Sequence, residues 1–183
     1  EIISGIYLKN TLLKKQTEKW FSENAGSTKL KISSAGVETL FEVASLGSTD
    51  LRKKNQFGSR ENENEVFLNK YFTGSLLPLI RLSEVYYIAA ECEPVLADRY
   101  EWLNQARARR GLPNLTAVSE DDFMKRLRGE YLREFIGEGQ IFFMYKRLYI
   151  NINSDENGYD TSTYGAREER YVLPMPSGEI ANR

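Results

Sequence analysis

The feature that most constrains the fold is an apolar segment between residues 78 and 92. Apolar side chains would cover nearly the whole circumference of a helix here; they are Leu79, Ile80, Leu82, Val85, Tyr86, Ile88, Ala89, Ala90 and Cys92. Pro78 suits the first position of that helix, because its missing N–H is not needed there. A helix that is apolar on nearly all sides lies inside a protein. The sequence therefore predicts a buried helix that begins at residue 78.

A second helix follows directly, so the segment predicts a helical hairpin. Pro94 ends the first helix, and one face of the second is apolar at Leu96, Tyr100, Leu103 and Ala106. Arg107, Arg109 and Arg110 lie in its last turn, where cations complement the helix dipole. Gly111 suits a left-handed cap beyond that turn. Two antiparallel helices joined by a short turn are the unit from which helical-repeat proteins are built.

Two further helices complete the predicted core. Ser119 and Asp122 have the spacing of an N-terminal capping box. An apolar stripe with a period of four follows at Phe123, Leu127, Tyr131 and Phe135. Gly137 and Gly139 end this third helix, and a strongly apolar fourth helix begins at residue 141. The chain is therefore expected to be mainly α-helical.

The chain divides into three parts around this core. Residues 1–77 form a mixed segment of strands, helices and loops, residues 78–150 form the helical core, and residues 151–183 contain a polar loop, a short strand and a C-terminal cap. Outside the core we expect a buried strand over residues 1–7, helices over residues 8–21 and 37–43, and a short strand over residues 171–173.

Composition excludes several classes of function. The chain has no histidine, which removes Ser/His and Cys/His catalysis and most common zinc and iron sites. Lys and Arg total 25 against 26 Asp and Glu, so the chain lacks the basic excess of a nucleic-acid-binding protein. No apolar run reaches the roughly 18 residues that a transmembrane helix needs. We therefore expect no metal, no cofactor and no nucleic-acid partner.

Three acidic residues in and just after the third helix could carry chemistry. Glu130, Glu134 and Glu138 follow one another at intervals of one helical turn, and two carboxylates could serve as a glycosidase pair. The alternative is a structural one, in which they pair with Arg126, Arg133 and Arg147 at ordinary helical spacings. Catalytic carboxylates usually converge on a cleft from separate elements, so we favour the structural interpretation.

Two smaller features of the first core helix have the same two interpretations. Arg81 and Glu84 could bind a ligand, or they could form a polar clamp between helices, which we favour because a buried ion pair must be compensated. Under the clamp interpretation, Glu84→Ala costs about 3 kcal/mol of stability. Cys92 could be a nucleophile, but no histidine exists to activate it, so we expect a buried free thiol.

Aromatic residues outside the core are the remaining candidates for ligand binding. Tyr7 and Trp20 flank the predicted first helix, and Tyr159 and Tyr164 lie in the polar loop after residue 151. Exposed rings stack against the C–H faces of sugars in carbohydrate-binding proteins. These four residues are our candidate ligand-binding residues.

Four motifs follow one another along the chain: PLIRLSEVYYIAAE (78–91), WLNQARARRGLP (102–113), EYLREF (130–135) with EGQ (138–140), FF (142–143) and KR (146–147), and LPMP (173–176). Their order resembles that of the SusD/RagB-like proteins of Bacteroidota. Residues 1–3 and 49–53 fit the same order. Gln140, Ile141 and Met144 depart from the family, which commonly has His, Arg and Asp at these positions. None of these departures touches a catalytic group, because the family has none.

The resemblance implies a fold and a function. The fold would be a SusD-like helical fold with tetratricopeptide-like helix pairs and a few short strands, and this chain would be the C-terminal part of a longer protein. Such proteins are lipid-anchored on the outer membrane and exposed at the cell surface. They capture glycans or other nutrients and cover a SusC-like TonB-dependent transporter. The lipid anchor would precede this chain, and Tyr7 and Trp20 would lie nearest the ligand.

Three functions remain open from the sequence. The first is a non-catalytic protein that binds an oligosaccharide or polysaccharide by ring stacking and hydrogen bonds. The second is a helical-repeat interaction scaffold without its own ligand. The third is a glycoside hydrolase that uses Glu130 or Glu134. We favour the first.

Overall fold

The chain folds into a mainly helical body with short antiparallel strands at its margins. The structure is a computed structural model, and it describes residues 2–7, 9, 15, 31–42, 45, 49–59, 65–70, 76–153, 163–164 and 171–172. The predicted fold class, helical with a few short strands, is confirmed over this part of the chain.

The described helices are α2 (Ser34–Leu40), α4 (Leu51–Gln56), α5 (Leu82–Cys92), α6 (Leu96–Ala108), α7 (Glu120–Phe135) and α8 (Gln140–Leu148). The described strands are β1 (Ile2–Tyr7), β2 (Lys31–Ser33), β3 (Phe57–Ser59), β4 (Glu65–Leu68), β5 (Leu76–Arg81), β6 (Ile152–Asn153) and β7 (Thr163–Tyr164). They pair in three small antiparallel sheets: β1 with β5, β4 between β2 and β3, and β6 with β7.

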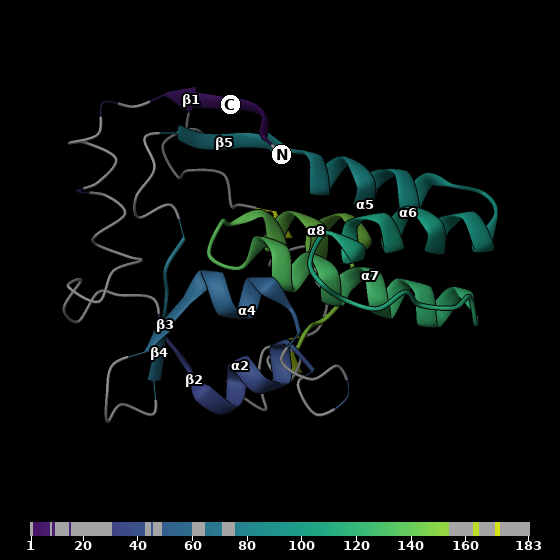
Figure 1. Cartoon of the computed structure of the whole chain (residues 1–183). Helices are drawn as coiled ribbons and strands as arrows, with labels where there is room; N and C mark the ends of the chain where they lie inside the picture. Colours follow the sequence, from purple (N-terminus) through teal and green to yellow (C-terminus); the bar gives the residue numbers. More distant parts are fainter. Residues whose placement is uncertain are drawn as a thin grey trace, which may run out of the picture.

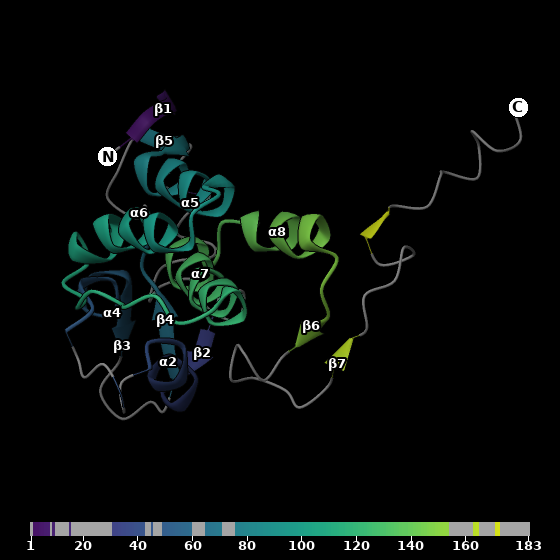
Figure 2. The same cartoon turned by 90° about the vertical axis from the view of Figure 1, so that its right-hand side faces the viewer.

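The helices lie between two of these sheets (Figure 1). The ribbon of β1 and β5 borders the N-terminal end of α5, and the sheet of β2, β3 and β4 lies with α2 and α4 on the opposite side of the molecule. Helices α5 and α6 form the predicted hairpin and pack on α7. Figure 2 shows α7 between α6 and α8, so α7 is the central helix.

The start of α7 and the ends of α6 and α7 lie where the local signals predicted them. The Ser119 hydroxyl accepts a hydrogen bond from the Asp122 N–H at 3.2 Å and caps α7. Gly111, Gly137 and Gly139 all have φ between 75° and 78°, the left-handed region that favours glycine. Gly111 also allows a close approach, since a Cβ there would lie 2.9 Å from the Thr49 carbonyl oxygen.

The first core helix begins later than the sequence predicted. Residues 76–81 form strand β5, and α5 starts only at Leu82. Pro78 is paired with Gly5 of β1 in a two-stranded ribbon. Each strand of such a ribbon has an unpaired edge, so a residue without an N–H is tolerated there. Pairing with β1 therefore overrides the helical pattern of residues 78–81.

The prediction that this helix is buried all round is also wrong. Its inner face, with Tyr87 and Ala90, is fully buried. The opposite face carries Leu82, Val85 and Ile88, which are 41 to 48% exposed. Helix α5 packs on α6 and α7 over one side, and the described residues leave the other side uncovered.

Four predictions outside the helical core need correction or fall outside the described residues. Strand β1 forms as expected, but all six of its residues are exposed, because β5 is the single strand that pairs with it in the described part of the chain. The short helix predicted over 37–43 lies over Ser34–Leu40, since the Ser33 hydroxyl caps it at Gly36. Tyr171 has helical rather than extended backbone. The helix predicted over 8–21 lies almost entirely outside the described residues.

Candidate functional site

Helix α7 directs two carboxylates into the junction between α4, α5 and α6. Glu130 and Glu134 are one turn apart on α7, and both are fully buried. They share this face because residues four apart on a helix lie above one another. The sequence analysis gave two interpretations of this pair, as catalytic groups or as partners in structural ion pairs.

Three guanidinium groups surround Glu130. Arg52 Nη2 lies 2.8 Å from its Oε2, and Arg133 Nη2 lies 3.1 Å from its Oε1. Arg107 donates a further hydrogen bond to Oε1. All three arginines are buried to 98% or more of their side-chain surface. Glu130 therefore joins α4, α6 and α7 at one point.

Glu134 is surrounded in the same way. Its Oε1 accepts from Arg81 at 2.6 Å and from Arg110 at 2.9 Å. Its Oε2 lies 3.2 Å from Arg52 Nη1, so Arg52 bridges both carboxylates. The Ser83 hydroxyl lies 3.2 Å from Oε1.

The electrostatics of this cluster oppose acid–base catalysis. Burial alone would raise the pKa of Glu130, but Arg52, Arg133 and Arg107 outweigh it and lower that pKa to about 2. Burial is likewise outweighed at Glu134, where Arg110, Arg52 and Arg81 lower the pKa to about 2. A general acid needs a raised pKa and access to its substrate. Neither Glu130 nor Glu134 has a raised pKa or access to a substrate, so the cluster has a structural role.

Several members of this cluster were missed by sequence reasoning. Arg52 follows the N-cap residue Asp50, whose carboxylate accepts from it at 2.7 Å. Lys70 is 5% exposed, and its ammonium group donates to the carbonyl oxygens of Glu134 and Ile136 and to Glu138. The sequence held no local signal for these contacts, because Arg52 and Lys70 lie more than 60 residues from their partners on α7.

Three predicted ion pairs are replaced by others among the described residues. The Arg81 guanidinium pairs with Glu134 and Glu138 rather than with Glu84, because Arg81 ends strand β5 and points toward the end of α7. Arg126 lies near Glu42 and Asp122 rather than Glu130.

Arg147 forms the third replaced pair. It binds the carboxylate of Glu91 on α5 through two hydrogen bonds rather than an acidic residue of α7. Glu130 with Arg133 is the one predicted pair of this set that is present, at 3.1 Å.

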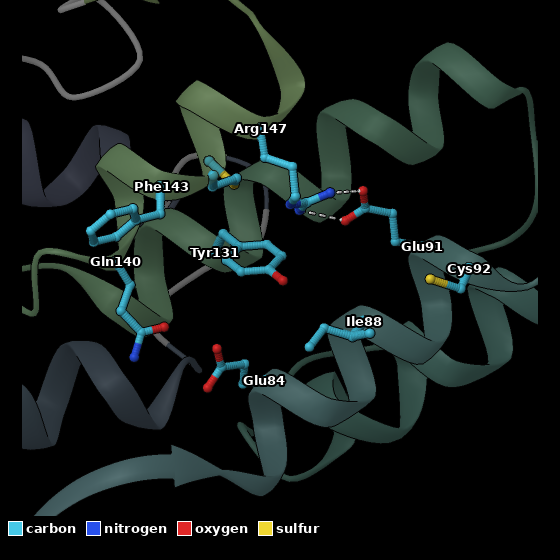
Figure 3. Close-up of a pocket in the computed structure, with 9 residues that line it drawn as sticks. Glu84, Ile88, Glu91, Cys92, Tyr131, Gln140, Phe143 and Arg147 are labelled. Carbon is cyan, nitrogen blue, oxygen red and sulfur yellow. Dashed lines mark hydrogen bonds and ion pairs between the residues drawn. The ribbon is translucent and has the colours of Figure 1, made fainter. Parts of the chain in front are cut away.

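Helices α5 and α8 border an open groove with a volume of about 600 Å³ (Figure 3). Tyr131 of α7 forms its floor, and its hydroxyl points into the groove. Glu84 and Gln140 face each other at one end, and the Glu91–Arg147 pair lies at the other. The remaining lining residues are Ile88, Cys92, Phe143 and Met144. Cys92 is exposed at this groove, so the expectation of a buried thiol is wrong.

The predicted aromatic ligand residues are not brought together by the described structure. Tyr7 ends strand β1 and is 76% exposed. The backbone of Tyr164 lies in β7, paired with Ile152. Trp20 and Tyr159 lie outside the described residues. Tyr7 is therefore the candidate whose surroundings are known, and it is open to solvent.

Two further properties apply to the described residues. They contain no cluster of three or more acidic, cysteine or histidine side chains that could hold a metal ion. Among the helices described, none has the length and apolar character needed to cross a membrane.

Comparison with known proteins identifies the family. The model of the SusD family matches residues 51–183, which include α4, every core helix and the buried carboxylate cluster. The chain belongs to the SusD family. No curated protein and no solved structure matches it. Members of the SusD family are binding proteins rather than enzymes, and they are generally associated with glycan binding for nutrient uptake at the outer membrane and cell surface.

Proposed function

We propose that this chain is the C-terminal part of a non-catalytic glycan-binding protein at the cell surface, which delivers its ligand to a SusC-like TonB-dependent transporter. The observation that carries the proposal is the match to the SusD family over residues 51–183. The surroundings of Glu130 and Glu134 support it, because the carboxylates best placed for hydrolysis are fully buried and their pKa values are lowered to about 2. Capture rather than turnover is the function that fits both observations.

The proposal includes the cellular setting that the family implies. The full-length protein would be held on the outer membrane by an N-terminal lipid anchor. Its ligand would be an oligosaccharide or polysaccharide. Tyr7, Trp20, Tyr159 and Tyr164 remain our proposed stacking residues, and Tyr7 is supported by its exposure.

Calorimetry with oligosaccharides tests the proposal directly. Purified protein should release or absorb heat on binding at least one of a set of linear gluco-, manno- and xylo-oligosaccharides. An assay for reducing ends should detect no cleavage of the sugar that binds. Binding accompanied by new reducing ends would contradict a capture function and would instead support a glycoside hydrolase.

A second function is favoured by one specific observation. Leu82, Val85 and Ile88 form an exposed apolar row on α5. Rows of this kind are used in protein–protein contacts, so a helical-repeat scaffold without its own ligand is the alternative. Co-purification with a transporter in the absence of any sugar affinity would favour the scaffold.

A further inference from the structure

The groove between α5 and α8 combines an apolar wall with polar ends. Phe143 of α8 is 67% exposed and Ile88 of α5 is 48% exposed, and both line the groove together with Met144. A ring that presents two-thirds of its surface to solvent beside a hollow offers a flat stacking surface. The apolar wall therefore suits a ligand with one flat apolar face.

The first polar end has hydrogen-bonding capacity left over, although the Glu84 carboxylate already accepts a hydrogen bond from the backbone N–H of Arg81. Glu84 points into the groove opposite Gln140 (Figure 3). Burial raises the pKa of Glu84, with the charge of Arg81 opposing the shift. Among the described residues no cation forms an ion pair with Glu84, since the Arg81 guanidinium is held by Glu134 and Glu138. The carboxylate and the amide are therefore available to a ligand with hydroxyl groups.

The second polar end and the floor add further polar atoms. Arg147 and Glu91 form a two-bonded pair across the groove, in which a planar guanidinium lies fixed against a carboxylate. Tyr131 is 6% exposed, and its hydroxyl points into the groove between these ends (Figure 3). The Tyr131 hydroxyl oxygen accepts a hydrogen bond from Arg147, so the floor and the second polar end form one connected polar group.

A sugar ring has the chemistry that this arrangement requires. A pyranose presents a flat C–H face, which stacks on an aromatic ring, and a rim of hydroxyl groups, which bind carboxylate, amide and guanidinium groups. The volume of about 600 Å³ falls within the range of small-molecule sites, which is roughly 300–1,000 Å³. A wholly apolar segment of polypeptide fits less well, because it would remove water from Glu84 without replacing its hydrogen bonds.

We propose that the groove between α5 and α8 is a saccharide-binding subsite. A pyranose ring stacks on Phe143 and its hydroxyl groups bind Glu84 and Gln140 at one end, with Tyr131 and Arg147 toward the other. The inference rests on the proposed glycan-binding function and assigns a location to it. This location differs from that of the aromatic candidates Tyr7, Trp20, Tyr159 and Tyr164.

Two substitutions in the groove and one matched control test the inference. Phe143→Leu keeps an apolar side chain and removes the ring, and Glu84→Gln keeps the shape and removes the charge. The control is Trp102→Leu, which removes a ring of α6 that packs on Tyr86 and does not line the groove. Circular dichroism melts of all three variants establish that each one is folded. The probes are linear gluco-, manno- and xylo-oligosaccharides of four to six residues, titrated by calorimetry.

The expected result is a selective loss of affinity. Phe143→Leu should weaken binding about fivefold through lost stacking, and Glu84→Gln about tenfold through a lost charge-assisted hydrogen bond. Trp102→Leu should leave affinity unchanged. Binding by the parent chain that both groove variants retain would overturn the subsite and leave the proposed function standing. Failure of the parent chain to bind any of these sugars would overturn the proposed function and the subsite with it.

Discussion

The carboxylates on the two sides of this molecule have opposite surroundings. On α7, Glu130 and Glu134 are fully buried, and each is contacted by three guanidinium groups. On α5, Glu84 lines an open groove with no ion-pair partner among the described residues, and Glu91 has the single partner Arg147. The residue type is the same, so the number of cations and the access of solvent decide the role. The buried carboxylates of α7 hold helices together through ion pairs, whereas the carboxylates of α5 that line the groove are accessible to a ligand.

The largest expected effect comes from removing an enclosed carboxylate. Glu134→Ala should lower the free energy of unfolding by about 4 kcal/mol, because Arg81, Arg110 and Arg52 would lose their shared partner in the interior. Urea denaturation followed by circular dichroism measures the change. The matched variant is Glu84→Ala, which should cost less than about 1 kcal/mol. Equal losses in the two variants would remove the distinction between enclosed and open carboxylates.

Acid should destabilise the enclosed side selectively. The pKa values of Glu130 and Glu134 are lowered from 4.5 to about 2 in the folded chain. A lowered folded pKa gives stability that is fully present above pH 4.5 and is lost as the pH falls toward 2. The expected loss by pH 3 is about 2 kcal/mol for each group, measured as a falling midpoint of urea unfolding. A midpoint that stays constant from pH 5 to pH 3 would contradict the role of the arginines.

A smaller effect of opposite sign is expected at Tyr87. This tyrosine is fully buried beside the cluster, and its hydroxyl has no hydrogen-bond partner among the described residues. An unsatisfied buried hydroxyl is costly, so Tyr87→Phe should raise the free energy of unfolding by about 1 kcal/mol. The thermal midpoint of the variant should rise accordingly. A clear loss of stability would show that the hydroxyl has a partner in the folded protein.

The smallest effect is expected on the open side. Arg147 is 51% exposed by side-chain area, and its pair with Glu91 is accessible to water and salt. Exposed ion pairs contribute between about 0 and 1 kcal/mol. Arg147→Ala should therefore change the free energy of unfolding by about 0.5 kcal/mol, and the change should shrink further in 0.5 M salt. A loss of stability as large as that of Glu134→Ala would show that the Glu91–Arg147 pair contributes as much as the buried ion pairs.

The sequence predicted local features well and long-range ones poorly. The caps at Ser119 and Gly111 and the core stripe of α7 depend on neighbours within four residues, and they lie where expected. The start of α5 was misplaced because pairing with β1, about 75 residues earlier, extends the preceding strand to Arg81. Local spacing cannot reveal a partner that far away along the chain.

The same limit applied to the candidate site. The Glu130–Arg133 pair follows from a spacing of three residues, whereas Arg52 contacts Glu130 across 78 residues. The groove was also missed, since Glu84 and Gln140 come from helices separated by more than 40 residues. Apolar periodicity indicated that α5 packs against other helices, but it did not indicate which face remains uncovered.

The attachment of α4 to the end of α6 has a consequence for how the chain folds. The Leu51 N–H donates to the Arg110 carbonyl at 3.0 Å, which places Arg52 between the two buried carboxylates. A chain shortened to begin at residue 60 would keep all of α5 to α8 and yet lack this guanidinium. It should collapse into a molten globule, with native-like far-ultraviolet circular dichroism but mobile side chains. Helix content alone is thus a poor measure of whether the native state has been reached, because residues that precede α5 complete the packing of the core.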